Sequence, residues 1–197
     1  MKKLFLFLIA FILIIQIINF VTMPVTYDWI FIVMIFISIA IFALIYICVN
    51  YGKIVKSFKN KEYDYVISKE NCYLARNTSL KNNIFYMIAI SYLEKGEKDK
   101  FFEYTNKIES KDLYLSKCFL MIIYSLITED TTLEAKWRED YNIIPINALK
   151  SRYDEILNLL IKSKSSQCVW TITEMKAIES IKIDAIKEII LKCTMEN

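Results

Sequence analysis

Two long apolar runs stand close together at the start of the chain, Leu4 to Val21 and Trp29 to Val49. Neither run contains Asp, Glu, Lys or Arg. A bilayer core about 30 Å thick needs roughly 20 apolar residues, and a central Asp or Lys costs about 2.5 to 3.5 kcal/mol. The pattern therefore predicts two membrane-spanning helices, over about 4–21 and 29–49. The alternative is a pair of buried core helices in a soluble fold.

Basic residues near the runs predict an orientation. Lys2 and Lys3 precede the first run, no basic residue lies between the runs, and four lysines follow the second: Lys53, Lys56, Lys59 and Lys61. Because positive residues favour the cytosolic side, we expect a multi-pass cell-membrane protein with both termini cytosolic. Cleavage of the first run as a signal peptide is the minor alternative, and it leaves the large domain on the same side.

The four lysines also predict contact with the membrane surface. Next to an anionic inner leaflet, each basic residue contributes about 1 kcal/mol of attraction. The chain thus divides into a transmembrane hairpin, residues 1–52, and a cytosolic domain, residues 53–197. The lipid bilayer is its first expected partner.

Helical periodicity dominates the cytosolic domain, so the predicted fold class is all-α. Apolar residues recur at spacings of three and four, and the segments run over about 80–95, 98–109, 112–127, 131–144, 148–162 and 173–193. Thr78 or Ser79, Ser110, and the pair Thr131 and Glu134 are the candidate caps. The stretch Cys118 to Ile123 is apolar all round, which indicates a helix central to the core or covered by a partner.

The helix pair around Gly96 resembles a tetratricopeptide repeat, over about residues 61–141. The first helix of that family carries bulky, aliphatic, small and Tyr positions, and the turn after it carries a glycine. Seven residues of this sequence fit those packing positions in two successive units: Phe85, Ile88, Ala89, Tyr92, Gly96, Leu120 and Tyr124. The resemblance implies stacked helical hairpins that bind other proteins. An ordinary helical bundle is the alternative.

Several chemistries find no support in the composition. The domain from residue 53 onward carries a net charge of +2, from 23 basic and 21 acidic residues, which does not indicate nucleic-acid binding. The chain has no histidine and only two glycines, so it lacks Ser-His and Cys-His nucleophile pairs and glycine-rich phosphate loops. Five scattered cysteines form no CxxC motif. We therefore expect no enzyme activity, no metal and no cofactor.

Two acidic pairs, Glu129-Asp130 and Glu139-Asp140, are the remaining acid-base candidates. Adjacent helix residues point in different directions, which favours solvated faces or helix caps for these pairs.

The leading functional hypothesis is a membrane-anchored helical scaffold that binds another protein at the inner membrane surface. It rests on the repeat-like helices and the apolar stretch Cys118 to Ile123. The alternative is an accessory subunit of a larger membrane complex, engaged through the transmembrane hairpin. The abundance of Ile, Lys and Asn indicates a bacterial source.

Overall fold

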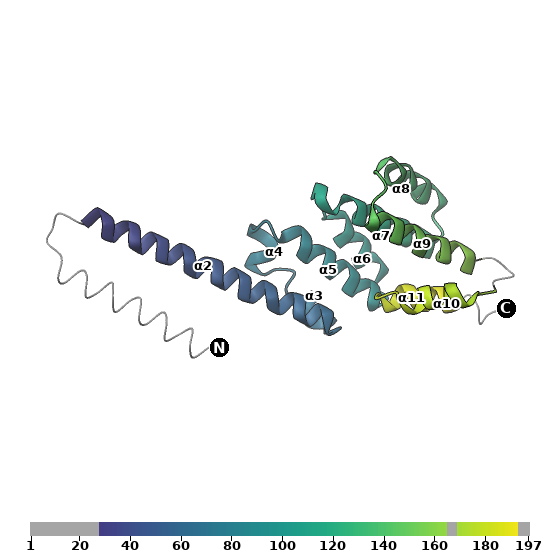
Figure 1. Ribbon diagram of the computed structural model, residues 1–197, viewed down its shortest axis with the longest axis horizontal. Helices are drawn as coiled ribbons and strands as arrows, with labels where there is room; N and C mark the ends of the chain where they lie inside the picture. Colours follow the sequence, from purple (N-terminus) through teal and green to yellow (C-terminus); the bar gives the residue numbers. More distant parts are fainter. Residues whose placement is uncertain (1–27, 165–168, 193–197) are drawn as a thin grey trace. The chain divides into compact units, whose positions relative to one another are not determined.

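The computed structural model describes residues 28–164 and 169–192 (Figure 1). Most of these residues are helical, and no strand occurs within those two ranges. The all-α fold class predicted from periodicity is therefore confirmed. The chain separates into two compact units, residues 1–51 and 52–197. The first predicted span, over 4–21, lies outside the described residues.

The described part of the first unit belongs to a single long helix, α2 (Asp28–Lys59), of 32 residues. From Ile32 onward this helix is long and apolar enough to cross a membrane, and no residue of its most apolar window is buried. A core helix of a soluble fold buries an apolar stretch of this kind. The uncovered apolar surface of α2 thus fits a membrane-spanning segment, the second of the two predicted from sequence.

Among the residues that the structure describes, ten elements follow α2 in the second unit. In chain order they are α3 (Tyr63–Ile67), α4 (Tyr73–Asn77), α5 (Lys81–Glu94), α6 (Lys98–Asn106), the 3-10 turn η2 (Lys111–Leu113), α7 (Tyr114–Thr128), α8 (Thr131–Ile143), α9 (Ala148–Ser163), α10 (Ile172–Glu179) and α11 (Asp184–Lys192).

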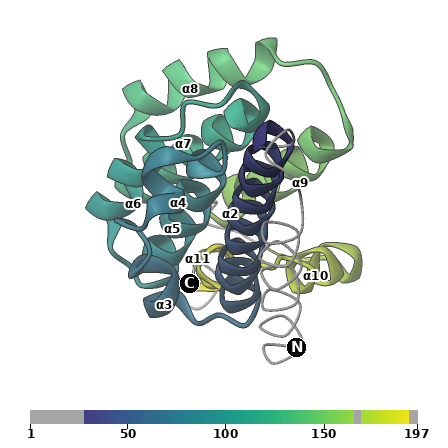
Figure 2. The ribbon, with the colours of Figure 1, turned by 90° about the vertical axis from the view of Figure 1, so that its left-hand side faces the viewer.

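Two helical hairpins form the centre of this unit. Helix α5 pairs with α6, α7 pairs with α8, and α6 also packs on α7, as Figures 1 and 2 show. On the other side of α5 lie the short helices α3 and α4. The C-terminal helices return to the centre, because α9 packs on α7 while α11 packs on both α9 and α5. Chain segments about 90 residues apart therefore share one core.

Helix α7 lies at the centre of that core. Every residue from Cys118 to Ile123 is at most 1% exposed, so this all-apolar stretch is covered on all sides by the chain itself. Burial of each large side chain stabilises the fold by about 1.5 to 3 kcal/mol. No partner is needed to cover this stretch, and it gives no support to partner binding.

Most helix bounds fall within a few residues of the predicted ones, but some caps differ. Thr78 and Ser79 do not cap α5, whose N-cap is Leu80 without a side-chain bond. For α8 the cap is Asp130, which accepts a hydrogen bond from the Leu133 N–H, and not Thr131. Ser110 accepts from the Asp112 N–H and so caps the 3-10 turn that precedes α7.

Two predicted segments differ from the helices in the structure. The expected helix over 98–109 ends at Asn106, and Ile108 is buried beyond its end. The terminal region expected over 173–193 is divided into α10 and α11. A capping box of Thr171 and Glu174 begins α10.

Candidate functional site: surfaces for membrane and protein contact

Three of the four lysines predicted at the membrane surface form a stripe on α2. Lys53, Lys56 and Lys59 are exposed, while Ile54 and Ser57 between them are buried in the second unit. Residues three apart lie on one side of a helix. The buried side of these last turns packs on the domain, and the opposite side presents three ammonium groups to the surroundings.

The fourth lysine, Lys61, is engaged within the protein. It follows α2 in a left-handed backbone conformation with φ of 61°, and its ammonium pairs with the carboxylate of Asp184 at the start of α11. The Lys61 pKa is raised, chiefly by this hydrogen bond to Asp184. Lys61 therefore ties the beginning of the domain to its end.

Glu94 reinforces the same junction from the end of α5. Its carboxylate accepts a hydrogen bond from the Ala185 N–H at 3.1 Å, so a residue of α5 satisfies one of the free N–H groups in the first turn of α11. Desolvation by burial is the main cause of the raised pKa of Glu94. Together Lys61 and Glu94 hold α11 in place.

The C-terminal helices cover the face that α5 and α7 share. The Tyr153 ring of α9 stacks on the Phe119 ring of α7, and the hydroxyl groups of Tyr153 and Ser116 lie 3.0 Å apart. Burial also raises the pKa of the Tyr86 phenol of α5, which interacts with Tyr153. This face is filled by the chain itself and is not open to a ligand.

The residues singled out for repeat-like packing lie between the paired helices. Phe85 and Tyr92 of α5 both contact the Tyr104 ring of α6, with centroids 5.7 Å and 5.4 Å apart. Ile88, Ala89 and Leu120 have no exposed surface. Tyr124 packs on Phe102 at 4.7 Å, and Gly96 forms the turn between α5 and α6 with φ of 74°. Five of these residues, Phe85, Ile88, Ala89, Tyr92 and Leu120, are buried and shape the hairpins from inside, whereas Tyr124 is half-buried and the Gly96 turn is exposed.

The loop between α8 and α9 presents apolar side chains to solvent. We call residues 142–149 the apolar loop: they comprise the end of α8, the connection over 144–147 and the start of α9, and they include no charged residue. Ile143 and Ile146 are 77% and 81% exposed. In this segment the helical pattern predicts only the end of one helix at about residue 144 and the start of the next at about 148. Its sequence signal is an uncharged run of Ile residues at the end of α8, without helical spacing.

A buried lysine braces the apolar loop from below. Lys150 is only 5% exposed, and its ammonium donates to the carbonyl oxygens of Asn142 and Ile144. The same ammonium lies 4.9 Å from the centroid of the Tyr141 ring. At the loop's other end, the Asn147 side chain accepts from the Lys150 N–H and caps α9. The loop is thereby held in one conformation with its isoleucines outward.

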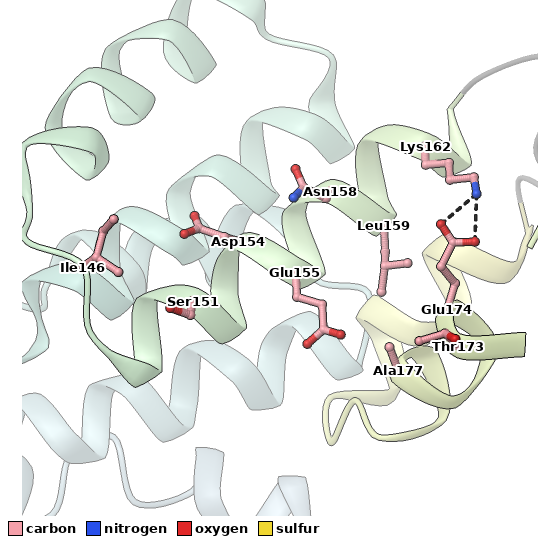
Figure 3. Close-up of a pocket in the computed structure, with 10 residues that line it drawn as sticks. All are labelled: Ile146, Ser151, Asp154, Glu155, Asn158, Leu159, Lys162, Thr173, Glu174 and Ala177. Carbon is pink, nitrogen blue, oxygen red and sulfur yellow. Dashed lines mark hydrogen bonds and ion pairs between the residues drawn. The ribbon is translucent and has the colours of Figure 1, made fainter. Parts of the chain in front are cut away.

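A groove runs along α9 from this loop toward α10. Figure 3 shows Ile146 at one end, Ser151 and Glu155 along α9, and the Lys162–Glu174 ion pair at the far end. Its volume is about 580 Å³, and it is open to solvent. Leu159, Thr173 and Ala177 complete its walls. We call this the α9 groove.

Three of the four residues in the acidic pairs considered for acid-base chemistry have structural roles. Asp130 caps α8, and its neighbour Glu129 ends α7 in a left-handed conformation with φ of 58°. Asp140 accepts a hydrogen bond from the Tyr114 hydroxyl at 3.0 Å, while Glu139 is exposed. The members of each pair thus serve different contacts.

Within the described ranges, the side chains do not form a metal-binding cluster, and the buried Cys118 has no activated thiol. No group of three or more His, Cys, Asp or Glu side chains that could hold a metal ion is present there. Cys118 is buried, and desolvation is the main reason that its pKa is raised to about 11. Its thiol therefore stays protonated near neutral pH and acts as an apolar core group.

Comparisons of this chain with family models, with curated proteins and with solved structures returned no match. Any functional inference therefore rests on the chain's own residues.

Proposed function

We propose that this protein is a membrane-anchored helical scaffold that binds a protein partner at the inner membrane surface. The apolar loop carries this proposal. Large apolar side chains that are exposed yet rigidly held are typical anchors of protein interfaces, because little conformational entropy is lost when they bind. Lys150 provides that rigidity at Ile143 and Ile146.

The membrane anchor is proposed to be a hairpin, with spans over 4–21 and 29–49 and both termini cytosolic. The apolar and uncovered surface of α2 supports the second span. The exposed stripe of Lys53, Lys56 and Lys59 at its end supports a cytosolic placement of the domain. These lysines would contact anionic headgroups, whereas Lys61 is already paired with Asp184.

The domain is proposed to use repeat-like helical hairpins as its frame. The side-by-side pairing of α5 with α6 and of α7 with α8 supports a tetratricopeptide-like arrangement. In this chain, however, α9 and α11 cover the shared face of α5 and α7. The partner is therefore proposed to bind outside that face, at the apolar loop.

Photo-crosslinking in the native membrane tests the scaffold proposal. We expect the full chain to yield a specific crosslinked partner, and we expect the double variant Ile143→Ser/Ile146→Ser to lose it. The matched control is Val169→Ser/Ile172→Ser, which removes two apolar residues that are 77% and 79% exposed elsewhere on the surface. Recovery of the chain alone, or equal loss in both double variants, would contradict the proposal.

The second candidate is an accessory subunit that engages a larger membrane complex through its hairpin. The uncovered apolar surface of α2 favours this candidate, because neighbouring transmembrane helices are an alternative to lipid as its surroundings. Replacement of both spans by an unrelated hairpin separates the two. Partner binding that survives the replacement supports the scaffold, and binding that disappears supports the subunit.

A further inference from the structure

One face of α9 forms the floor of the α9 groove. Ser151, Glu155, Asn158 and Lys162 line it at spacings of four, three and four, which places them in one row along the helix. This row is about 16 Å long at about 1.5 Å per residue. Thr173, Glu174 and Ala177 of α10 line the other side of the groove only at its end next to Leu159 and Lys162 (Figure 3). The α9 side of the groove therefore has the length of about three helical turns.

The charges of the groove are unbalanced. Asp154, Glu155, Glu174 and Lys162 line it, which gives three carboxylates and one ammonium. Lys162 donates to both oxygens of Glu174, at 2.7 and 2.8 Å. The two charges of this ion pair neutralise each other. Asp154 accepts from the Tyr141 hydroxyl at 2.9 Å and is partly exposed. Glu155 is exposed in the middle of the row. The groove therefore presents a net negative charge.

Apolar surface lies at one end of the groove and along its base. Ile146 belongs both to the apolar loop and to the groove, so the two features form one continuous surface. Leu159 and Ala177 add apolar contact beneath the carboxylates. A ligand that fits this surface must combine an apolar stripe with positive charge.

We infer that the α9 groove binds a basic, amphipathic helical segment of the protein partner, with its apolar stripe against Ile146, Leu159 and Ala177 and its cations beside Asp154 and Glu155. This inference rests on the proposed scaffold function and names the chemistry of the partner. An amphipathic helix in a groove between helices is a common mode of peptide recognition. An anionic membrane surface fits poorly, since the groove carboxylates would repel it.

Two peptide probes test the inference with the full chain in nanodiscs of zwitterionic phosphatidylcholine. Both probes are helical peptides of about 15 residues with leucine at every third or fourth position. One carries lysine on its polar side and the other carries glutamate. Fluorescence anisotropy measures their binding, and empty nanodiscs of the same lipid give the background. We expect the lysine peptide to bind at least about tenfold more tightly than the glutamate peptide, and less tightly as salt rises.

Variants of Glu155 locate the binding site. Loss of one partly exposed charge pair raises a dissociation constant about threefold, and reversal of the charge raises it about tenfold. We therefore expect Glu155→Gln to weaken binding of the lysine peptide and Glu155→Lys to weaken it further. Filling the groove with Asn158→Trp tests the same site without a charge change and is also expected to weaken binding. Glu139→Lys, an identical charge change at an exposed position of α8, should leave binding within about twofold.

Three results would overturn the inference: no peptide binding above empty nanodiscs, equal binding of both peptides, or equal effects of Glu155→Lys and Glu139→Lys. Each of these is distinguishable from failure of the scaffold proposal. A partner that is crosslinked in the native membrane and retained by Glu155→Lys leaves the scaffold in place and removes the groove as its site. A chain that crosslinks to no partner removes the scaffold itself.

Discussion

The ring of Tyr153 in α9 stacks on the ring of Phe119 in α7, with centroids 3.9 Å apart and planes 5° from parallel. Phe119 is 1% exposed and belongs to the apolar centre of α7. Tyr153 also has its hydroxyl 3.0 Å from that of Ser116. One side chain of α9 thus closes the core and positions the helix whose outer side forms the groove.

Substitution of Tyr153 should separate these two contacts. Tyr153→Phe keeps the stacked ring and loses the hydroxyl bond, so we expect the free energy of unfolding to fall by about 1 kcal/mol. Tyr153→Ala also loses the ring and leaves a cavity, with an expected loss of about 3 to 5 kcal/mol. Denaturant titration of the full chain in detergent measures both. Tyr73→Phe, at an exposed tyrosine, is the control and should change little.

Lys150→Met should loosen the apolar loop. The variant keeps a long apolar stem but removes the ammonium that donates to the carbonyl oxygens of Asn142 and Ile144. We expect a loss of about 1 to 3 kcal/mol in stability and faster amide hydrogen exchange over 142–149. The control is Lys176→Met, at an exposed lysine of α10. Unchanged exchange in the loop would show that Lys150 does not brace it.

The two glycines of the chain should respond oppositely to substitution by alanine. Gly96 has a φ of 74°, a conformation that costs residues with a Cβ atom about 1 to 2 kcal/mol. Gly52 lies within α2, and a Cβ atom there would meet nothing within 4 Å. We expect Gly96→Ala to destabilise by that amount and Gly52→Ala to stabilise by about 0.5 to 1 kcal/mol. Thermal unfolding of both variants measures the difference, and equal shifts would be inconsistent with the turn geometry.

Acid should release α10 from α9. The hydrogen bond from Lys162, together with bonds from Thr171, lowers the pKa of Glu174 from 4.5 to about 2. A carboxylate with a lowered pKa contributes stability that is present above its unfolded value and is lost as pH falls through its folded value. We therefore expect amide exchange in α10 to accelerate as pH falls from 4.5 toward 2, after correction for the intrinsic rate.

Glu174→Gln provides the control for this acid response. The variant cannot titrate at this position, so its α10 should exchange faster than the wild-type helix above pH 4.5 and should lack the acid-dependent step. A wild-type profile that is flat in this range, or a variant that keeps the same step, would show that the Lys162–Glu174 pair does not hold α10.

Local features of the chain can be predicted from the sequence without a structure. The long apolar helix α2 follows from an unbroken apolar run. Helix α9 begins at the predicted residue and ends one residue later, because its buried positions recur at helical spacing. The stop at Gly96 follows from a backbone conformation that glycine adopts without strain. Each of these depends on residues within one or two turns of each other.

Helix caps can be predicted only in part from neighbouring residues. Asp130 and Thr131 are adjacent residues with capping side chains, and the backbone entry into α8 selected Asp130. Thr171 and Glu174 form a capping box at the start of α10, although the helical pattern predicts a helix only from residue 173 onward. The choice between adjacent candidates depends on where the preceding chain enters the helix, which packing sets.

By itself, the sequence determined an all-helical chain with an apolar membrane-length helix, because hydropathy and periodicity are local properties. Only the tertiary structure decided which segments are buried and which distant residues contact each other. It placed Cys118 to Ile123 at the centre of the core and joined Lys61 to Asp184 across 123 positions. It also turned Ile143 and Ile146 outward above a buried Lys150. These outcomes depend on contacts between distant segments, and the free energy of such contacts is defined only once the helices pack.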